Sequence, residues 1–257
     1  MTITYDMRGK TVFVFGGTSG INLGIAEAFA KAGAQLAVAS RSAEKVAVAK
    51  VRLSHAGTAA MGYSLDVREP VAVSEAITNF TGTHGPIDVL ISGAAGNFPS
   101  MAAQLSPNGF KSVVDIDLLG TFNVMRAAHA HLRKPGACVI NISAPQAQVA
   151  MAMQVHVCAA KAGVDMLTKT LAIEWGPEGV RVNGVVPGPI DGTEGMARLA
   201  PTEAAREKVV KSVPLRRMGT PDDIAQVCLF LASDSARYVS GAIIPVDGGW
   251  LASGAKM

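Results

Sequence analysis

The 257-residue sequence predicts a doubly wound α/β fold, in which helices cover both faces of a parallel β-sheet. Three observations support this prediction. Short apolar runs alternate with helix-like segments along the whole chain. Each run is continuously apolar, as is typical of strands that are buried on both faces. Hydrophobic residues make up 49% of the chain, and no linker or repeat divides it, so we expect a single domain over residues 1–257.

The apolar runs mark the expected strands. They lie at residues 11–15, 35–40, 59–65, 88–92, 137–143, 180–186 and 242–246. The expected helices lie at residues 20–32, 42–55, 70–82, 106–133, 155–175 and 221–233. Right-handed crossovers connect parallel strands through such helices, so we expect one seven-stranded parallel sheet.

The connection between the sixth and seventh expected strands is longer than a crossover requires. It spans residues 187–220, opens with PGPIDGTEG and continues into the polar, helix-like PTEAAREKVVKSV. Long connections in compact domains commonly carry function. We therefore expect a lid over a substrate, and a packing helix at a subunit interface is the compatible alternative.

Charge and composition limit which binding partners and which cell compartment are expected for the protein. The net charge is +3 and the basic residues are spread along the chain, so we expect no nucleic-acid partner, whereas acidic small molecules remain compatible. No apolar run approaches the roughly 18 residues of a membrane span, and the N-terminus lacks a signal-peptide pattern. The isolated cysteines Cys138, Cys158 and Cys228 indicate reduced thiols in a cytoplasmic compartment. The final Ala-Lys-Met (255–257) resembles a variant peroxisomal address, which leaves the peroxisomal matrix as the alternative.

A glycine-rich segment joins the first expected strand to the first expected helix. In FVFGGTSGINLG (13–24), Gly16 and Gly20 permit backbone turns that other residues avoid. The N–H groups at the start of the following helix can hold a pyrophosphate. At the first strand-to-helix turn of a parallel sheet, this arrangement indicates a dinucleotide site.

The end of the second expected strand predicts which dinucleotide binds. The segment ASRSAEK (39–45) offers Ser40 and Arg41 where NAD-preferring sites usually carry a carboxylate. A guanidinium suits a 2′-phosphate by its charge and its bidentate geometry. We therefore expect NADPH/NADP+ as the cofactor.

Further motifs follow the glycine segment. They are SGAAGN (92–97), ACVINIS (137–143), a helix that contains Lys161, RVNGVVPGPI (181–190) and SGAIIPVDGG (240–249). With these motifs the sequence resembles the short-chain dehydrogenase/reductase family over essentially its whole length. The resemblance implies a Rossmann fold that binds a nicotinamide cofactor. It also implies a homotetramer, because SGAIIPVDGG resembles an interface segment of the family.

Two positions depart from the T-G-x-x-x-G-x-G pattern of that family. Phe15 replaces the threonine and Asn22 replaces the last glycine, while SGAAGN stands where the family has N-N-A-G. Asparagine tolerates a left-handed backbone, so we expect the turn to persist with looser helix packing. Asp66 follows the third strand, where the family's acidic residue meets the adenine, and a helix N-cap is its alternative role. The cofactor contacts that the resemblance implies are Gly16, Thr18, Ser19, Gly20, Ile21, Arg41, Ser42, Asp66, Val67, Ala94, Lys161, Pro187, Ile190 and Thr193.

The catalytic set of the family is only partly present. Its Asn, Ser, Tyr and Lys correspond here to Asp117, Ala144, Val157 and Lys161. General-acid catalysis contributes ~10²–10⁴-fold in rate, so efficient reduction of a ketone is not expected without the tyrosine. Reduction of a conjugated thioester has other needs, because the proton goes to carbon and the site requires oxyanion donors and a positioned water.

One branch of the family fits this pattern. GAAGNF (93–98), QVH (154–156) and above all PGPIDGTEGMARL (187–199) resemble the peroxisomal type of 2,4-dienoyl-CoA reductase. The resemblance implies NADPH-dependent reduction of a 2,4-dienoyl-CoA to an enoyl-CoA in fatty-acid metabolism. It assigns the proton-delivering water to Asp117 and the nicotinamide ribose to Lys161. It places Arg68, Phe98, Ser106, Asn108 and Arg198 around the acyl-CoA substrate.

Other interpretations remain open. The enzyme alternative is a carbonyl or 3-oxoacyl thioester reductase with an unusual acid, and the other is a catalytically silent NADP(H)-binding regulatory protein. Arg68 and Arg198 are also compatible with solvated surface charge, and Asp117 with a structural carboxylate.

Several remaining side chains admit more than one role. Gln146 is a candidate donor to the thioester oxygen, and a packed or capping role is favoured for His156. His129 and His131 do not share a helix face, so no metal site is expected. Three methionines are candidates for an acyl pocket or for core filling. They are Met151, Met153 and Met166.

Overall fold

The seven expected strands form one sheet in the computed structural model, which describes residues 4–254. The strands are β1 (Thr11–Phe15), β2 (Gln35–Ser40), β3 (Met61–Ser64), β4 (Val89–Ser92), β5 (Cys138–Ile142), β6 (Arg181–Pro187) and β7 (Ile243–Val246). Their order is β3-β2-β1-β4-β5-β6-β7, and every neighbouring pair is parallel. The predicted seven-stranded parallel sheet is confirmed. The chain changes direction across the sheet between β1 and β4, the place where open α/β sheets bind ligands.

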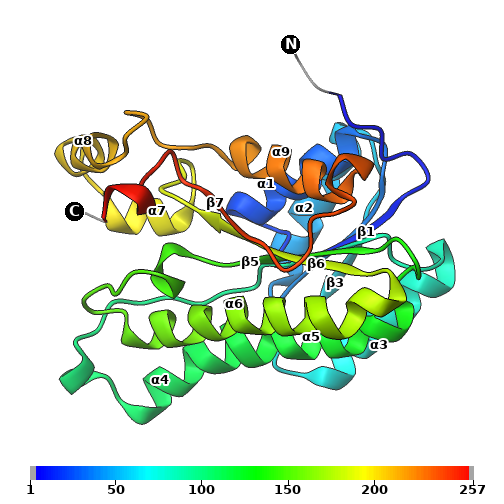
Figure 1. Ribbon diagram of the computed structural model, residues 1–257, viewed down its shortest axis with the longest axis horizontal. Helices are drawn as coiled ribbons and strands as arrows, with labels where there is room; N and C mark the ends of the chain where they lie inside the picture. Colours follow the sequence, from blue (N-terminus) through cyan, green and yellow to red (C-terminus); the bar gives the residue numbers. More distant parts are fainter. Residues whose placement is uncertain (1–3, 255–257) are drawn as a thin grey trace.

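Helices cover both faces of this sheet (Figure 1). The helices above it in the figure are α1 (Gly20–Lys31), α2 (Ala43–Ala56) and α9 (Pro221–Ala232). Those below it are α3 (Pro70–His84), α4 (Pro107–Val114), α5 (Gly120–Ala128) and α6 (Val155–Trp175). Each face has its own buried core, and alternate residues of β1 enter the two cores: Val12 and Val14 the upper, Phe13 and Phe15 the lower. This two-sided burial explains why the strand sequences are apolar throughout.

The long helix expected at 106–133 is divided. A π-helical turn at Asp115–Leu119 separates α4 from α5, and a 3₁₀ turn at His129–His131 follows α5. After the π turn, Gly120 lies close to the loop that precedes α3. A Cβ added to Gly120 would be 2.5 Å from Val67 Cγ2 in that loop. π turns inside helices frequently occur at functional sites. Here the turn carries Asp117, whose side chain is buried.

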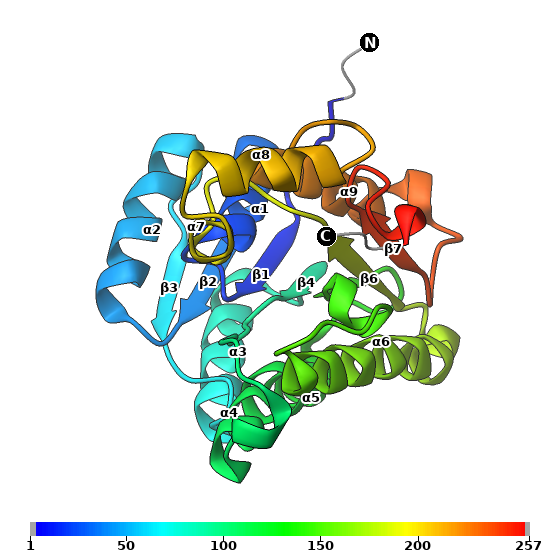
Figure 2. The same cartoon turned by 90° about the vertical axis from the view of Figure 1, so that its left-hand side faces the viewer.

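The segment between β6 and β7 contains two helices, α7 (Glu194–Leu199) and α8 (Glu203–Ser212). Both lie beyond the carboxyl ends of the strands, on the α1 side, while the start of α6 lies on the other side (Figures 1 and 2). Thr193 lies close to the first turn of α1, where a Cβ added at Gly20 would be 3.6 Å from Thr193 Cγ2. The segment therefore faces the place where the glycine-rich turn opens.

A capping box starts α9. Thr220 Oγ1 accepts a hydrogen bond from Asp223 N, and the Asp223 carboxylate accepts one from Thr220 N. Thr220→Ala should lower the free energy of unfolding by about 1 kcal/mol, the usual cost of losing such a cap. Denaturant titration of the two proteins measures this difference. A Thr202→Ala variant, at the cap of the exposed α8, is the comparison, since α8 buries no residue and α9 buries five. Equal stability of Thr220→Ala and the native protein would contradict the prediction.

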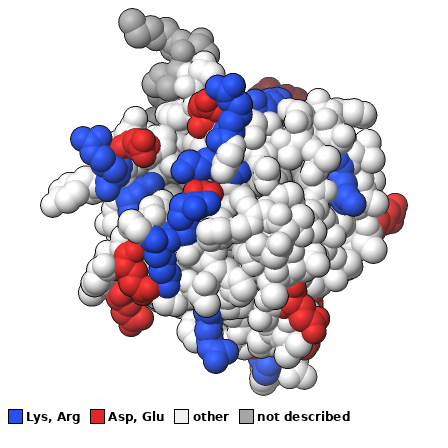
Figure 3. Space-filling view, turned by 90° about the vertical axis from the view of Figure 1, so that its right-hand side faces the viewer, with Lys and Arg blue, Asp and Glu red and all other residues white. Residues whose placement is uncertain are grey.

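Charged groups are mixed on the surface that Figure 3 shows. Lys and Arg side chains stand beside Asp and Glu side chains, and much of this face is uncharged. Close ion pairs account for such neighbours, for example Arg8 with Asp6 at 2.6 Å. Within residues 4–254 no helix combines the length and the apolar character that crossing a membrane requires. The Ala-Lys-Met end (255–257) lies outside the described residues.

Candidate active site

The turn between β1 and α1 forms a cradle of backbone N–H groups. Gly16 and Gly20 have φ of +78° and +53°, conformations that other residues rarely adopt. A Cβ at Gly16 would be 2.8 Å from Ala94 N, so the turn passes directly against the end of β4. Ser19, at the N-cap of α1, makes no capping hydrogen bond with its side chain. The first N–H groups of α1 therefore remain available for an anion such as a pyrophosphate.

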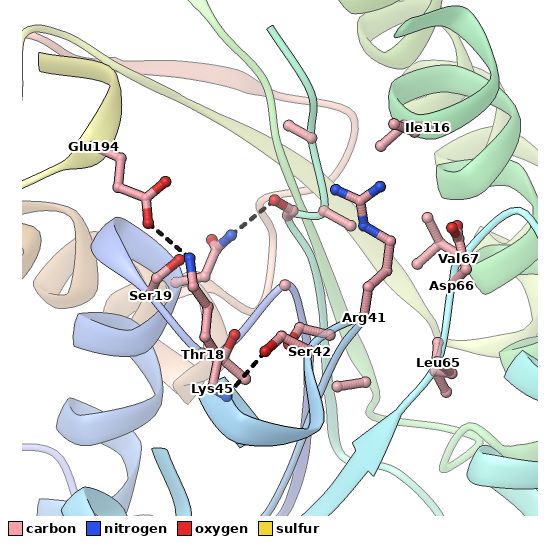
Figure 4. Close-up of a pocket in the computed structure, with 17 residues that line it drawn as sticks. Thr18, Ser19, Arg41, Ser42, Lys45, Leu65, Asp66, Val67, Ile116 and Glu194 are labelled. Carbon is pink, nitrogen blue, oxygen red and sulfur yellow. Dashed lines mark hydrogen bonds and ion pairs between the residues drawn. The ribbon is translucent and has the colours of Figure 1, made fainter. Parts of the chain in front are cut away.

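A cavity of about 330 Å³ extends from this cradle toward the ends of β2 and β3 (Figure 4). Arg41 lines it, and its guanidinium reaches toward Ile116. Among the described residues that guanidinium has no hydrogen-bonded acceptor and no ion-pair partner. Asp66 also lines the cavity, and its carboxylate binds Arg68 at 2.6 Å. The hydrogen bond from Arg68 holds the pKa of Asp66 below its usual range. Asp66 is not an N-cap, because the N-cap of α3 is Glu69.

A second cation borders this cavity, and the sequence did not single it out. Lys45 lies in the first turn of α2, four residues after Arg41. Its Nζ is 2.7 Å from Glu194 Oε1, at the start of α7. This ion pair connects the wall of the cavity to the segment between β6 and β7 (Figure 4). Arg41 precedes Ser42, the N-cap of α2, so no helical spacing relates it to Lys45, and the only signal in the sequence was a second basic residue close after Arg41.

A larger cavity of about 650 Å³ continues from the cradle past the ends of β5 and β6. Asp117 and Lys161 line it, although both side chains are almost fully buried. Asp117 Oδ1 accepts a hydrogen bond of 2.7 Å from Gly96 N. Lys161 Nζ donates to Ile142 O at 3.0 Å and lies 3.5 Å from Asp117 Oδ2. Asp117 Oδ2 has no hydrogen-bond donor among the described residues, so it is an acceptor at the cavity wall.

Hydroxyl donors are scarce around this pair. Ala144 and Val157 line the cavity where the family has its serine and tyrosine. The hydroxyl of the neighbouring Ser143 is turned to the buried Asp165 carboxylate, whose pKa is raised by burial. A cavity with these walls can hold a water on Asp117, but it has no phenol to protonate an alkoxide.

Two glutamines lie at the cavity wall and bind each other. Gln146 Nε2 donates to Gln154 Oε1 at 2.7 Å, and both side chains line the cavity. The amide N–H group of Gln146 is thus directed to Gln154. Its assignment as the donor to a thioester oxygen stays a prediction.

All predicted cofactor residues line one cavity or the other, although they come from six separate segments. Around the smaller cavity lie Gly16, Thr18, Ser19, Arg41, Ser42, Asp66, Val67 and Ala94. Around the larger one lie Ser19, Gly20, Ile21, Lys161, Pro187, Ile190 and Thr193. The two cavities meet at Ser19, Asn22, Gly93, Ala95 and Glu194. Together they form one elongated space, as an extended dinucleotide requires.

The predicted substrate residues are not gathered in the same way, because none of the five lines either cavity. Arg68 is paired with Asp66, and Arg198 is exposed with Glu194 Oε2 at 3.5 Å. Ser106 caps α4 by accepting from Gly109 N, and Asn108 in the first turn of α4 is exposed.

Phe98, the fifth predicted substrate residue, packs against a buried histidine with the two rings tilted at 54°. Its ring centroid is 4.7 Å from that of His156. His156 is fully buried within α6 and does not line the larger cavity, so it is a packed residue and not a replacement acid. Of the three methionines, Met151 lines the larger cavity, whereas Met153 and Met166 are exposed elsewhere.

The reason given for tolerating Asn22 is corrected by the structure. Asn22 lies inside α1, and the only described non-glycine residues with positive φ are Met153 and Arg216. The position therefore needs no left-handed backbone, and the asparagine is accepted as an ordinary helical residue. Its side chain is buried and donates from Nδ2 to Gly93 O at 2.8 Å.

His129 and His131, at which the sequence predicted no metal site, each contact another side chain. His129 Nε2 lies 2.9 Å from Glu178 Oε1, and His131 Nδ1 lies 2.9 Å from Thr81 Oγ1. Across residues 4–254 no three His, Cys, Asp or Glu side chains are grouped so that they could hold a metal ion.

Known proteins share this fold and part of this sequence. A family model described as Enoyl-(Acyl carrier protein) reductase matches residues 16–251. A solved short chain dehydrogenase from Bacillus anthracis superposes with a TM-score of 0.85 at 37% identity, covering 95% of this chain and 97% of that one. The chain belongs to the short-chain dehydrogenase/reductase family. It is an oxidoreductase of this family, whose fold holds a nicotinamide cofactor.

Within the short-chain dehydrogenase/reductase family, similar relatives carry one kind of name. A Pongo abelii protein named peroxisomal 2,4-dienoyl-CoA reductase is 45% identical over 248 residues, which cover 95% of this chain and 85% of the relative. A Bacillus subtilis protein named probable 2,4-dienoyl-CoA reductase is 41% identical, with 95% and 98% covered. The resemblance seen in the motifs is confirmed along most of the chain.

The residues present fit a nicotinamide dinucleotide. The first N–H groups of α1, which the Ser19 side chain leaves uncapped, are available to a pyrophosphate, and the Arg41 guanidinium offers charge to a phosphate beyond it. The buried Asn22 Oδ1 has no donor among the described residues, which leaves an acceptor at the junction of the two cavities.

Proposed function

We propose that this protein reduces a 2,4-dienoyl-CoA, or a closely similar unsaturated acyl-CoA, to an enoyl-CoA with NADPH in fatty-acid metabolism. The observation that carries the proposal is the buried Asp117–Lys161 pair at a cavity whose wall has Ala144 and Val157 in place of hydroxyls. Such a site suits protonation of carbon from a held water better than protonation of an alkoxide. The names of the relatives at 41–45% identity support the same substrate class.

In this proposal the chain's own residues bind and orient the reactants. NADPH supplies a hydride to the conjugated acyl chain when it occupies the two cavities. The N–H groups of the cradle bind its pyrophosphate, and Arg41 with Lys45 binds the 2′-phosphate by charge. Lys161 Nζ, fixed by Ile142 O, stands where it holds the nicotinamide ribose and places positive charge near the developing enolate.

Asp117 is the proposed holder of the proton source. Gly96 N–H fixes its Oδ1, so Oδ2 is the oxygen that accepts a hydrogen bond from a water in the cavity. A water held in this way is positioned to protonate the enolate carbon, and the positive charge of Lys161, whose Nζ is 3.5 Å from Asp117 Oδ2, stabilises the hydroxide that is left. The apolar residues Val157 and Met196 exclude further water from the same cavity.

Residues 187–220 act as the lid in this proposal. Met196 and Leu199 of α7 and Val209 of α8 line the larger cavity, so the segment covers it with apolar side chains.

Assembly into a homotetramer is proposed as well, and exposed apolar residues support it. Those on the π turn, α5 and α6 are Leu119, Phe122, Val155, Met166 and Ile173. A cytoplasmic location, with the peroxisomal matrix as the alternative, also stays a proposal.

The cofactor preference tests the role of Arg41. The native protein should bind NADPH at least about tenfold more tightly than NADH, which corresponds to ~1.4 kcal/mol for a charge-assisted phosphate contact. Arg41→Asp should narrow or reverse this ratio, because a carboxylate repels the phosphate and accepts from a ribose hydroxyl. Fluorescence titration of both nucleotides measures it. Arg52→Ala is the matched control, since Arg52 pairs with Glu27 and lines neither cavity. Coincident NADPH and NADH curves for the native protein would refute the preference.

The reaction itself is tested by following NADPH oxidation with a 2,4-dienoyl-CoA and, separately, with a 3-oxoacyl-CoA of the same chain length. Preferential turnover of the dienoyl ester, with an enoyl-CoA as product, supports the proposal. Faster turnover of the 3-oxoacyl ester would favour the carbonyl reductase with an unusual acid. Tight NADPH binding without turnover of either ester would favour the regulatory protein.

A further inference from the structure

Asn22 occupies the junction between the two cavities. It is one of five residues that border both, and its side chain is 9% exposed. Its Nδ2 donates to Gly93 O at 2.8 Å, while its Oδ1 is buried without a donor among the described residues. A buried polar atom without a partner is costly, so Oδ1 is expected to gain one when the site is filled.

The Asn22 amide fills the space that a side chain at position 93 would need. A Cβ built on Gly93 would lie 2.4 Å from both Nδ2 and Oδ1 of Asn22. The family pattern places glycine at position 22, whereas this chain has asparagine at position 22 and glycine at position 93. An asparagine at position 22 and a side chain at position 93 therefore cannot be accommodated together. In this chain the Asn22 amide reaches from α1 to the backbone of Gly93.

The contact also reaches the proposed proton site. Gly93 begins the segment that follows β4, and three residues later Gly96 N–H holds Asp117 Oδ1 at 2.7 Å. Asn22 thus ties the first turn of α1 to the backbone that fixes Asp117. Removing the amide leaves the Gly93 carbonyl without this donor, while Gly93 N–H still donates to Phe15 O at 3.0 Å.

The chemistry of Oδ1 limits what binds it. An amide oxygen accepts hydrogen bonds, and the oxygens of an ionised pyrophosphate cannot donate one. With the adenosine end in the smaller cavity, which Arg41 and Asp66 line, the donors that a bound dinucleotide brings to the junction are the hydroxyls of its second ribose and water carried on the phosphates.

We infer that Asn22 is a cofactor-binding residue, with Oδ1 accepting a hydrogen bond from an O–H group that arrives with the dinucleotide and Nδ2 positioning the segment from Gly93 to Gly96. The inference requires a nicotinamide dinucleotide and is independent of the acyl substrate.

Binding of NADP+ to variants at both positions tests the steric part. Asn22→Gly and Asn22→Ala should each raise the Kd about three- to tenfold, the range for one lost hydrogen bond. Equal increases in Kd for the two variants would attribute the effect to the lost amide and not to the low helix propensity of glycine. Gly93→Ala should weaken binding more, because its methyl group displaces the amide. The double variant Asn22→Gly/Gly93→Ala should return to within about threefold of Asn22→Gly, a recovery that requires the two positions to interact.

Folding is followed in parallel by thermal denaturation. If Gly93→Ala alone fails to fold, a folded double variant that binds NADP+ still demonstrates the exclusion. Additive losses in the double variant, or failure of both proteins to fold, would overturn the steric part.

Shorter nucleotides test the hydrogen bond of Oδ1. The probes are NADP+, 2′-phosphoadenosine 5′-diphosphate, which lacks the second ribose, and adenosine 2′,5′-bisphosphate, which also lacks the pyrophosphate. A loss in Asn22→Ala confined to NADP+ assigns the donor to the second ribose. A loss shared by NADP+ and the diphosphate, and absent for the bisphosphate, assigns it to water on the pyrophosphate. Equal losses for all three, or none, would overturn the role of Oδ1, because a purely structural asparagine does not distinguish them.

Discussion

Asp117→Ala is expected to lower kcat for a 2,4-dienoyl-CoA about 100-fold or more while the affinity for NADPH stays nearly unchanged. The carboxylate lies at the wall of the larger cavity, and its buried Oδ2 has no hydrogen-bond donor among the described residues. Asp117 is not among the residues that line the smaller cavity. A group that holds the proton source acts mainly in the transition state, so its loss appears in kcat and not in cofactor binding.

Steady-state kinetics together with NADPH titration measure both quantities. Asp115→Ala is the matched control, because Asp115 lies in the same π turn but pairs with Lys111 and lines neither cavity. Asp117→Asn adds a second comparison, since an amide oxygen can still accept from Gly96 N–H. Full activity of Asp117→Ala would contradict the proposed proton route. Equal losses in Asp115→Ala would attribute the effect to the turn and not to the carboxylate.

The elements of the fold were predictable because they depend on local patterns. Apolar runs marked the strands, and the helix expected at 155–175 coincides with α6. The break at Asp115–Leu119 was not predictable, because it depends on tertiary contacts. Gly120 lies against Val67, and the Asp117 carboxylate reaches Gly96 and Lys161. No spacing within residues 106–133 records these partners.

The candidate site was likewise predictable from the sequence only in part. The cofactor positions follow from the glycine turn and the strand ends, where the backbone itself makes the site, and sequence patterns record backbone requirements well. Side-chain pairs between distant segments were missed, such as Lys45 with Glu194, which lie 149 residues apart. Asn22 was recognised as a departure from a pattern, but its partner Gly93 became visible only in the structure. Met196 and Leu199 line the larger cavity beside the predicted Met151 and were not singled out in the sequence, while the predicted substrate residues line neither cavity and stay predictions.

Lys161→Ala is expected to weaken cofactor binding and turnover together and to lower the free energy of unfolding by about 3 kcal/mol, since it leaves one member of a buried ion pair without its partner. Lys161 Nζ and Asp117 Oδ2 are 3.5 Å apart and both side chains are buried, so solvent screens them little. Without the ammonium group, the Asp117 carboxylate retains only the hydrogen bond from Gly96 N.

The double variant Asp117→Asn/Lys161→Ala separates these effects. Replacing the carboxylate by a neutral amide removes the uncompensated charge, so the double variant should regain much of the lost stability but none of the activity. Denaturant titration and turnover with a dienoyl-CoA measure the two properties on the same proteins. A double variant less stable than Lys161→Ala would show that the pair does not interact as the geometry indicates. Native-like NADPH affinity in Lys161→Ala would remove the lysine from the cofactor site, because an ammonium that holds the nicotinamide ribose cannot be lost without a change in Kd.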